Sequence, residues 1–154
     1  PSHLKMLIDS HCHLTKQFLE DPAETINRAK ENGVGKIICV GTNLEDSKEA
    51  IQIARKFPNV YATVGIHPEE TCDDWDKFEE LVKQPKVVSI GECGLDFHLY
   101  VVSSDRNKQP TYKLERVRQK GLFQKQIKIA KKLNLPLITH IRDTQQDLMQ
   151  TGKT

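Results

Sequence analysis

The sequence predicts a parallel α/β fold of the TIM-barrel type, with about five of the eight βα units of such a barrel present. Short apolar segments of strand length alternate strictly with segments of helical periodicity along the 154 residues, and this alternation is typical of βαβ units. No glycine-rich phosphate loop follows the first strand, which disfavours the alternative, an open doubly wound sheet. Histidines and a glutamate end several of the predicted strands, where barrel enzymes carry their functional groups.

The first predicted strand is an apolar start followed by two histidines, in the segment Leu7 to His13. The segment Asp21 to Glu24 then supplies an aspartate that can cap a helix, a proline suited to the first helical position and a glutamate that completes a capping pattern. The predicted helix ends near Asn32, because two glycines follow it closely.

The middle of the chain repeats this alternation. Residues 36–40 are almost continuously apolar, which is typical of a parallel strand buried on both faces. Apolar residues recur at helical spacing from Leu44 to Phe57, and Pro58 ends that helix. A third strand is predicted over residues 60–66.

The second half of the sequence is predicted to contain three further helices, two strands and a long polar loop. The segment from Gly94 to Asp96 has turn composition, which favours a turn for Asp96. The predicted ranges are a helix at 73–83, a strand at 87–90, a loop at 100–111, a helix at 114–133, a strand at 136–140 and a helix that begins at 143.

Composition is that of an ordinary soluble globular protein, 37% hydrophobic and 29% charged, and its net charge of +2 does not by itself indicate nucleic acid or membrane. We find no run of 18 apolar residues and no hydrophobic signal-peptide region. A cytoplasmic or nuclear protein without a membrane partner is therefore expected.

The four cysteines have neither CxxC spacing nor a disulfide pattern, so we expect reduced thiols, with Cys39 in the core and Cys12 directed away from the neighbouring histidines.

Candidate metal ligands lie at the ends of separate predicted strands. His11 and His13 are two residues apart, so in an extended strand they share a face. His67, Glu92 and His140 follow the third, fourth and fifth strands. Each has an alternative explanation when taken alone: Glu92 as a loop carboxylate, and the two histidines as rim residues. Their joint occurrence at strand ends favours a metal site.

Three imidazoles and one carboxylate, from His11, His13, Glu92 and His140, suit Zn²⁺, Mn²⁺ or a similar cation better than Ca²⁺. A carboxylate can bridge two cations, and two cations together acidify a water and polarise a phosphoryl oxygen. Hydrolysis is therefore the expected class of reaction. Arg142 and Asp143, next along the chain, are open to a plainer interpretation as a surface pair or a helix cap.

Four segments together resemble the TatD family of metal-dependent hydrolases, in the same order and spacing. They cover essentially the whole chain, and their combination is highly specific. The segments are Ile8 to Leu14, Val64 to Pro68, Ile90 to Asp96 and Leu135 to Asp143.

The resemblance implies a barrel of the amidohydrolase type that uses two divalent cations (Mg, Mn or Zn) to hydrolyse DNA. It implies His11, His13 and His140 as metal ligands and Glu92 as the bridging, catalytic carboxylate. His67 and Arg142 match positions near the substrate phosphate.

Residues 1–154 are expected to be a single domain that lacks strands six to eight of a barrel, because eight units need about 250 residues. The ligand histidine after strand six and the aspartate after strand eight of the family are absent. We expect an excerpt of a longer protein or a natural short form, whose open sheet would self-associate, bind a completing partner or rearrange. Two alternatives stay open: an amidohydrolase that cleaves C–N or ester bonds, and a non-catalytic fragment or interaction module.

Overall fold

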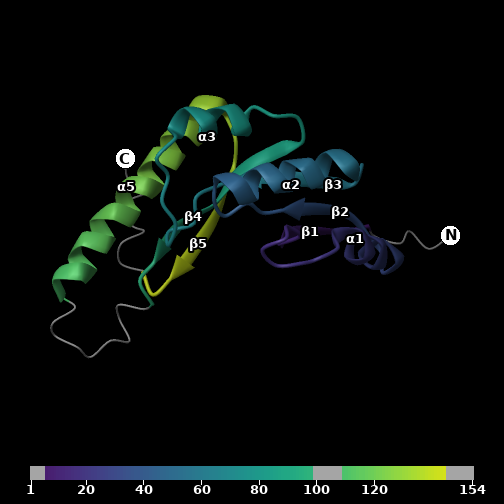
Figure 1. Ribbon diagram of the computed structural model, residues 1–154, viewed down its shortest axis with the longest axis horizontal. Helices are drawn as coiled ribbons and strands as arrows, with labels where there is room; N and C mark the ends of the chain where they lie inside the picture. The colour runs from purple at the N-terminus through teal and green to yellow at the C-terminus, as the bar shows by residue number, and fades with distance from the viewer. Residues whose placement is uncertain (1–5, 99–108, 145–154) are drawn as a thin grey trace.

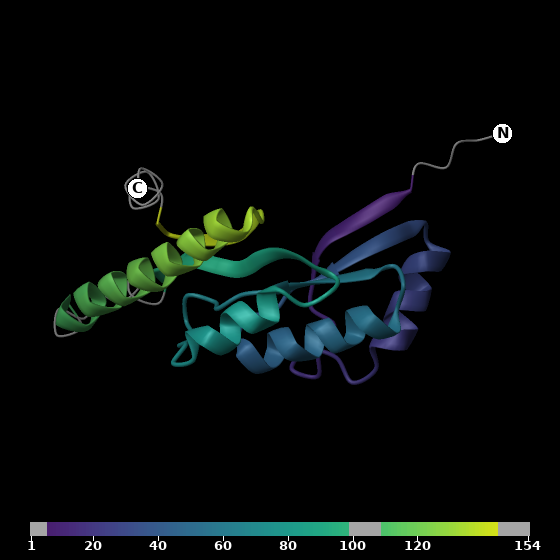
Figure 2. The ribbon, with the colours of Figure 1, turned by 90° about the horizontal axis from the view of Figure 1, so that it is seen from above.

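The computed structural model describes residues 6–98 and 109–144. Within them, five parallel strands form one sheet in the order β1-β2-β3-β4-β5. Figure 1 shows the sheet with its covering helices, and Figure 2 shows α1, α2 and α3 together on one side of the strands. The elements are β1 (Leu7–Cys12), α1 (Pro22–Glu31), β2 (Val34–Cys39), α2 (Leu44–Lys56), β3 (Val60–Val64), α3 (Trp75–Val82), β4 (Val87–Asp96), α5 (Gln109–Leu133) and β5 (Leu137–Arg142).

Side-chain caps fix the starts of three helices. Asp21 accepts a hydrogen bond from the backbone of Ala23, as the capping pattern predicts, and Pro22 occupies the first helical turn. Asn43 and Asp74 cap α2 and α3 in the same way. Each of these helices therefore starts at a defined residue, and the cap of α2 at Asn43 lies four residues after β2 ends at Cys39.

The core lies between the sheet and its helices. Residues of the central strands such as Ile37, Val64 and Ile90 pack with Ile51 of α2 and Phe78 of α3. A smaller cluster beneath α5 joins β4 to that helix, and it consists of Cys93, Leu95, Phe97 and Phe123. Burial of this apolar surface holds the helices against the strands.

Two predicted boundaries are wrong. Strand β4 continues six residues beyond Ile90 to Asp96, because its second half pairs in register with β5, from Cys93 opposite Thr139 to Asp96 opposite Arg142. Tertiary pairing thus overrides the turn composition around Gly94. Helix α5 begins at Gln109, inside the predicted loop; residues 99–108 of that loop lie outside the described residues. Of the helix predicted from Asp143, only Asp143 and Thr144 are described, and neither is helical.

The two outer strands present open edges among the described residues. Strand β1 pairs with β2, and β5 pairs with β4, so each has one unpaired side. Apolar side chains are exposed on both edge strands: Leu7 and Ile8 on β1, and Ile141 on β5. The sheet is therefore a half-barrel, as predicted. No helix in the described ranges combines the length and apolar character needed to cross a membrane.

Candidate metal centre

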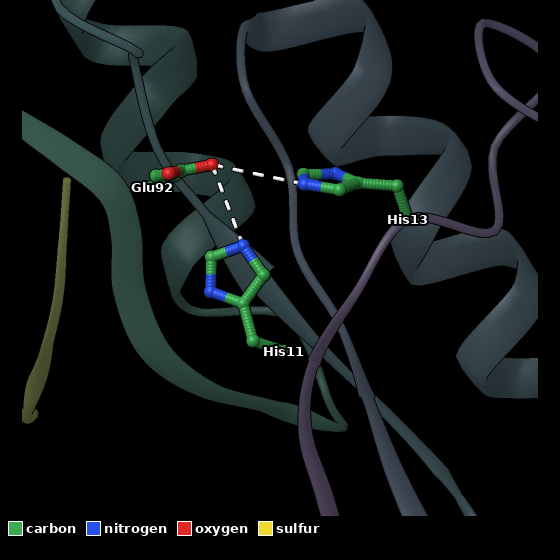
Figure 3. A group of neighbouring side chains, drawn as sticks. All are labelled: His11, His13 and Glu92. Atoms are coloured by element: carbon green, nitrogen blue, oxygen red, sulfur yellow. Dashed lines mark ion pairs between the residues drawn. The ribbon is translucent and has the colours of Figure 1, made fainter.

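Two histidines of the first strand segment face a carboxylate of β4 (Figure 3). Nε2 of His11 lies 3.6 Å and Nε2 of His13 lies 3.8 Å from the same oxygen, Oε2 of Glu92. The two imidazole rings meet edge to face, with centroids 5.2 Å apart. The shared face predicted from their two-residue spacing is confirmed, and Cys12 between them turns away to bond to the carbonyl of Ile38.

His140 of β5 joins Glu92 to a second carboxylate. Its Nδ1 lies 2.9 Å from Oε1 of Glu92, and its Nε2 lies 2.8 Å from Oδ2 of Asp96. The register explains this position, because His140 is opposite Gly94, midway between the two acidic residues of β4. His140 therefore bridges both carboxylates, and each of its ring nitrogens is occupied.

Gly94 makes this close packing possible. Its φ of +146° lies in a region that residues with a side chain rarely adopt. A Cβ at this position would overlap the backbone carbonyl of His140. The glycine thus lets β5 approach β4 where the imidazole inserts between the carboxylates.

His67 stands beside this group at the end of β3, with its ring centroid 4.4 Å from that of His140. The backbone N–H of His67 donates to the carbonyl of Thr42 at 2.7 Å. Its Nδ1 accepts from the backbone N–H of Glu69 at 3.2 Å. Because Nδ1 is an acceptor, a neutral ring carries its proton on Nε2, which is then a hydrogen-bond donor.

The electrostatics of the cluster favour the charged form of Glu92. Burial alone would raise the pKa of Glu92, but the hydrogen bond from His140 and the neighbouring imidazoles outweigh it, so that this pKa is below its ordinary value. The hydrogen bond with Glu92, supported by Asp96, raises the pKa of His140. Burial and the charge of His140 lower the pKa of His67. Of the neighbouring pair His67 and His140, a proton therefore resides on His140.

The segment after β2 holds two of these residues through the backbone. The carbonyl of Gly41 accepts from the backbone N–H of Glu92 at 2.8 Å, and the neighbouring Thr42 accepts from His67. Thr42 is in turn held by the buried carboxylate of Asp46, which accepts from its N–H and its hydroxyl. Asp46 also accepts from the hydroxyl of Thr15, which follows β1. One buried aspartate therefore ties together the loops after β1 and β2.

Within residues 6–98 and 109–144, the potential ligands form two groups, in each of which the donor atoms lie within 4.8 Å of one another. The first is His11, His13 and Glu92; the second is His67, Asp96 and His140.

Imidazole nitrogens combined with carboxylate oxygens suit Zn²⁺, Mn²⁺ and similar divalent cations, so the donor chemistry of the first group fits. Nδ1 of His13 is buried and has no hydrogen-bond partner in the described ranges, so Nε2 is the atom through which this ring can act. In the second group, a cation would have to replace a proton of His140, because both ring nitrogens already bond to carboxylates. The described residues therefore fit a divalent cation.

The structure brings together His11, His13, His67, Glu92 and His140 from the sequence prediction. Arg142 ends β5 with an exposed side chain, and no contact joins that side chain to the cluster within the described part of the chain. Asp143 pairs with His98 at 2.7 Å, which differs from the predicted pair with Arg142.

Asp96 is the residue that the sequence prediction misplaced. It is 5% exposed and bonds to His140, so the turn assignment is wrong. Its spacing of four residues from Glu92 is the signal that could have found it, because alternate residues of one strand share a face.

Parallel strands whose carboxyl ends present imidazoles and carboxylates close together are typical of metal-dependent hydrolases of the barrel type. Residues 8–154 match the family model described as TatD related DNase. The chain belongs to this family, as the resemblance of its four segments predicts.

Curated relatives carry names that agree with the family. The chain is 35% identical over 146 residues to the 3'-5' ssDNA/RNA exonuclease TatD of Salmonella typhimurium, a match that covers 91% of this chain and 51% of the relative. It is 36% identical over 149 residues to the metal-dependent hydrolase YabD of Bacillus subtilis, with coverage of 94% and 54%. The chain thus spans about half the length of the curated relatives it matches.

Solved structures confirm the fold. The crystal structure of YjjV, a TatD homologue from Escherichia coli, aligns with a TM-score of 0.79 and 32% identity over 97% of this chain and 56% of that one. A TatD family hydrolase from Entamoeba histolytica aligns with a TM-score of 0.76 and 27% identity over 96% and 54%. An amidohydrolase structure from Saccharomyces cerevisiae shares the fold, at 21% identity and a TM-score of 0.69.

Proposed function

We propose that the protein containing this chain is a nuclease that hydrolyses phosphodiester bonds of single-stranded DNA or RNA, using two divalent cations (Mg, Mn or Zn). The observation that carries the proposal is the convergence of four imidazoles and two carboxylates at the carboxyl ends of β1, β3, β4 and β5. The name of the Salmonella relative supports a nucleic-acid substrate and an exonuclease. Family membership supports a phosphodiester rather than a C–N or ester bond, so the amidohydrolase alternative has no better support.

Each described residue has a defined task in this proposal. His11, His13 and Glu92 would hold one cation, and Asp96 and His140 would hold the other. Glu92 could contribute to both positions, because its two oxygens face different histidines. When bound, the cations would polarise the phosphoryl group and lower the pKa of a water. Glu92 is the proposed catalytic residue because it remains ionised and links the two positions.

Two further residues are proposed to bind the substrate phosphate. His67 is neutral at neutral pH because its pKa is lowered, and its Nε2 proton is available to a phosphate oxygen. Arg142 contributes an exposed positive charge beside this site, at the end of β5. Phosphate contacts of this kind carry affinity without reading the base sequence.

The test uses the full-length protein that contains this chain, because the curated relatives are about twice as long as the chain. Single-stranded oligonucleotides labelled at either end are incubated with Mn²⁺, and the products show both cleavage and its polarity. Glu92→Gln should abolish cleavage and weaken Mn²⁺ binding, whereas Glu45→Gln, on the exposed start of α2, should do neither. Equal activity of the wild type and Glu92→Gln would refute the assignment; a wild type that binds Mn²⁺ without cleaving nucleic acid would favour the non-catalytic alternative.

The single-domain assignment of residues 1–154 and a partner that completes the barrel also remain proposals. The unpaired edges of β1 and β5, with Leu7, Ile8 and Ile141 exposed, support further pairing by strands of the same polypeptide or by a second copy. Sedimentation of the full-length protein distinguishes these two sources, because pairing within one polypeptide gives a monomer and pairing with a second copy gives a dimer. A cytoplasmic location stays a prediction, and the bacterial relatives give no support to a nuclear one.

A further inference from the structure

Two glutamines of α5 each bond to the backbone of one residue at a strand end. The backbone N–H of Asp96 donates to Oε1 of Gln119 at 2.8 Å, and Nε2 of Gln119 donates to the carbonyl of Asp96 at 2.9 Å. Gln126 repeats this arrangement with Ile66, at 2.9 and 3.0 Å. Each amide thus provides both the acceptor and the donor that a neighbouring strand would supply.

The two glutamines lie seven residues apart, which places them on the same face of the helix, two turns from each other. They are 1% and 0% exposed, so their amides cannot exchange these bonds for water. A buried amide is costly unless its hydrogen bonds are made. Apolar packing alone does not explain polar side chains at these positions, whereas the paired backbone bonds do.

Gln119 completes the set of contacts that orients Asp96. One carboxylate oxygen of Asp96 accepts from the backbone N–H of His98 at 3.0 Å, and the other accepts from Nε2 of His140 at 2.8 Å. Gln119 holds both backbone groups of the same residue. Removing Gln119 frees the backbone of a proposed metal ligand while leaving its side chain unchanged.

Gln126 acts one residue before His67. It holds both backbone groups of Ile66, and beyond His67 the guanidinium of Arg118 donates to the carbonyls of Pro68 and Glu70, each at 2.7 Å. Side chains of α5 therefore form hydrogen bonds to the backbone both before and after His67. The metal ligands on β1 and β4 receive no contact from Gln126 among the described residues.

We propose that Gln119 and Gln126 are positioning residues with separate tasks: Gln119 sets the metal-binding carboxylate of Asp96, and Gln126 sets the phosphate-binding imidazole of His67. The second task rests on the proposed function, because it assigns the substrate phosphate to His67. Neither glutamine touches the reacting atoms.

The experiment compares Gln119→Leu and Gln126→Leu in the full-length protein with Gln124→Leu, a control on the same helix. Calorimetric titration measures the Kd for Mn²⁺ and, in the Mn²⁺-loaded protein, the Kd for inorganic phosphate; cleavage of an oligonucleotide gives KM and kcat. Thermal unfolding of each variant is recorded in parallel. If a leucine variant does not fold, the corresponding Gln→Glu variant replaces it, because the carboxylate keeps the acceptor and loses the donor.

Gln119→Leu should raise the Kd for Mn²⁺ about tenfold, within the range seen when a residue that orients a metal ligand is removed. Gln126→Leu should leave this Kd within about twofold of the control and raise both the phosphate Kd and the KM about tenfold. Equal effects of both variants on Mn²⁺ binding, in proportion to lost thermal stability, would overturn the proposal. A wild type that binds Mn²⁺ and phosphate without cleaving the oligonucleotide would refute the nuclease function alone, because both Kd values are measured without turnover.

Discussion

Nδ1 of His140 lies 2.9 Å from Oε1 of Glu92, and this contact joins the two groups of the candidate metal centre. In the metal-free protein the pKa of His140 is raised and that of Glu92 is lowered. Both side chains are mostly buried, 23% and 11% exposed, so water screens the pair only in part. Both ring nitrogens of His140 contact carboxylates, so a cation bound through either nitrogen would have to displace a proton from it.

The stability of the metal-free protein should therefore depend on pH. The folded pKa of His140 exceeds its unfolded value, so its contribution is fully present below the unfolded value and is lost as pH rises through the raised pKa. Glu92 has the opposite sign, and its contribution is lost as pH falls through its lowered pKa. Urea unfolding in a chelator should show His140→Gln destabilised by on the order of 2 kcal/mol near pH 6, a difference that shrinks toward pH 9. A difference that stays constant with pH would contradict this.

Gly94→Ala should destabilise the protein by about 2 kcal/mol or more, because the substitution combines a positive φ with overlap against the His140 carbonyl. The affinity for Mn²⁺ should fall as well. Gly121→Ala is the matched control: its Cβ would meet nothing within 4 Å, and a helical alanine should stabilise by about 0.5 kcal/mol. Chemical unfolding measures both variants, and similar effects at the two positions would count against the role of Gly94.

The cysteines should differ in reactivity. Burial raises the pKa of Cys12, Cys39 and Cys93 to about 12, so at pH 8 only about one in 10⁴ of these thiols is ionised. The pKa of Cys72 is also raised by burial, but by less. Iodoacetamide followed by peptide mass spectrometry should therefore detect modification of Cys72 first in the native protein, with all four modified after unfolding. Cys12 modified as fast as Cys72 would refute the prediction.

Arg142→Ala should weaken oligonucleotide binding several-fold and lower the slope of log affinity against log salt by about one, as expected for a lost phosphate contact. Lys30→Ala is the control, because Lys30 lies in the last turn of α1, at the opposite edge of the sheet. Fluorescence anisotropy at several salt concentrations gives both quantities. An unchanged slope for Arg142→Ala would remove Arg142 from the proposed phosphate site.

The strand and helix order could be predicted from the sequence because local signals agree with the fold. The cap at Asp21, the apolar run of β2 and the proline after Phe57 each mark a boundary that the structure reproduces to within a few residues. The end of β4 could not be predicted in this way. Its glycines resemble a turn, and only the pairing of Asp96 with Arg142 on a strand more than forty residues away makes that segment extended.

The residues of the candidate site also divide into those that local sequence signals predict and those that only tertiary contacts place. His11, His13, His67 and His140 could be predicted because each stands near the end of an apolar strand. Asp96 was misplaced together with its strand, and Gln119 and Gln126 gave no local signal, because a glutamine in a basic helix resembles a solvated residue. Only the packing of α5 on β4 shows that these amides are buried against other backbone segments.

The bonds from Gln119 and Gln126 end on peptide groups, and every residue except proline offers the same N–H and C=O. The hydrogen bonds from α5 therefore do not depend on which side chains stand at the positions they hold. Replacement of Asp96 by another metal-binding residue would change the chemistry of the site, while the hydrogen bonds of Gln119 to the backbone at this position would remain. This independence makes the half-barrel a practical scaffold for redesign, in which reactivity is changed at the strand ends and rigidity is retained from the helix.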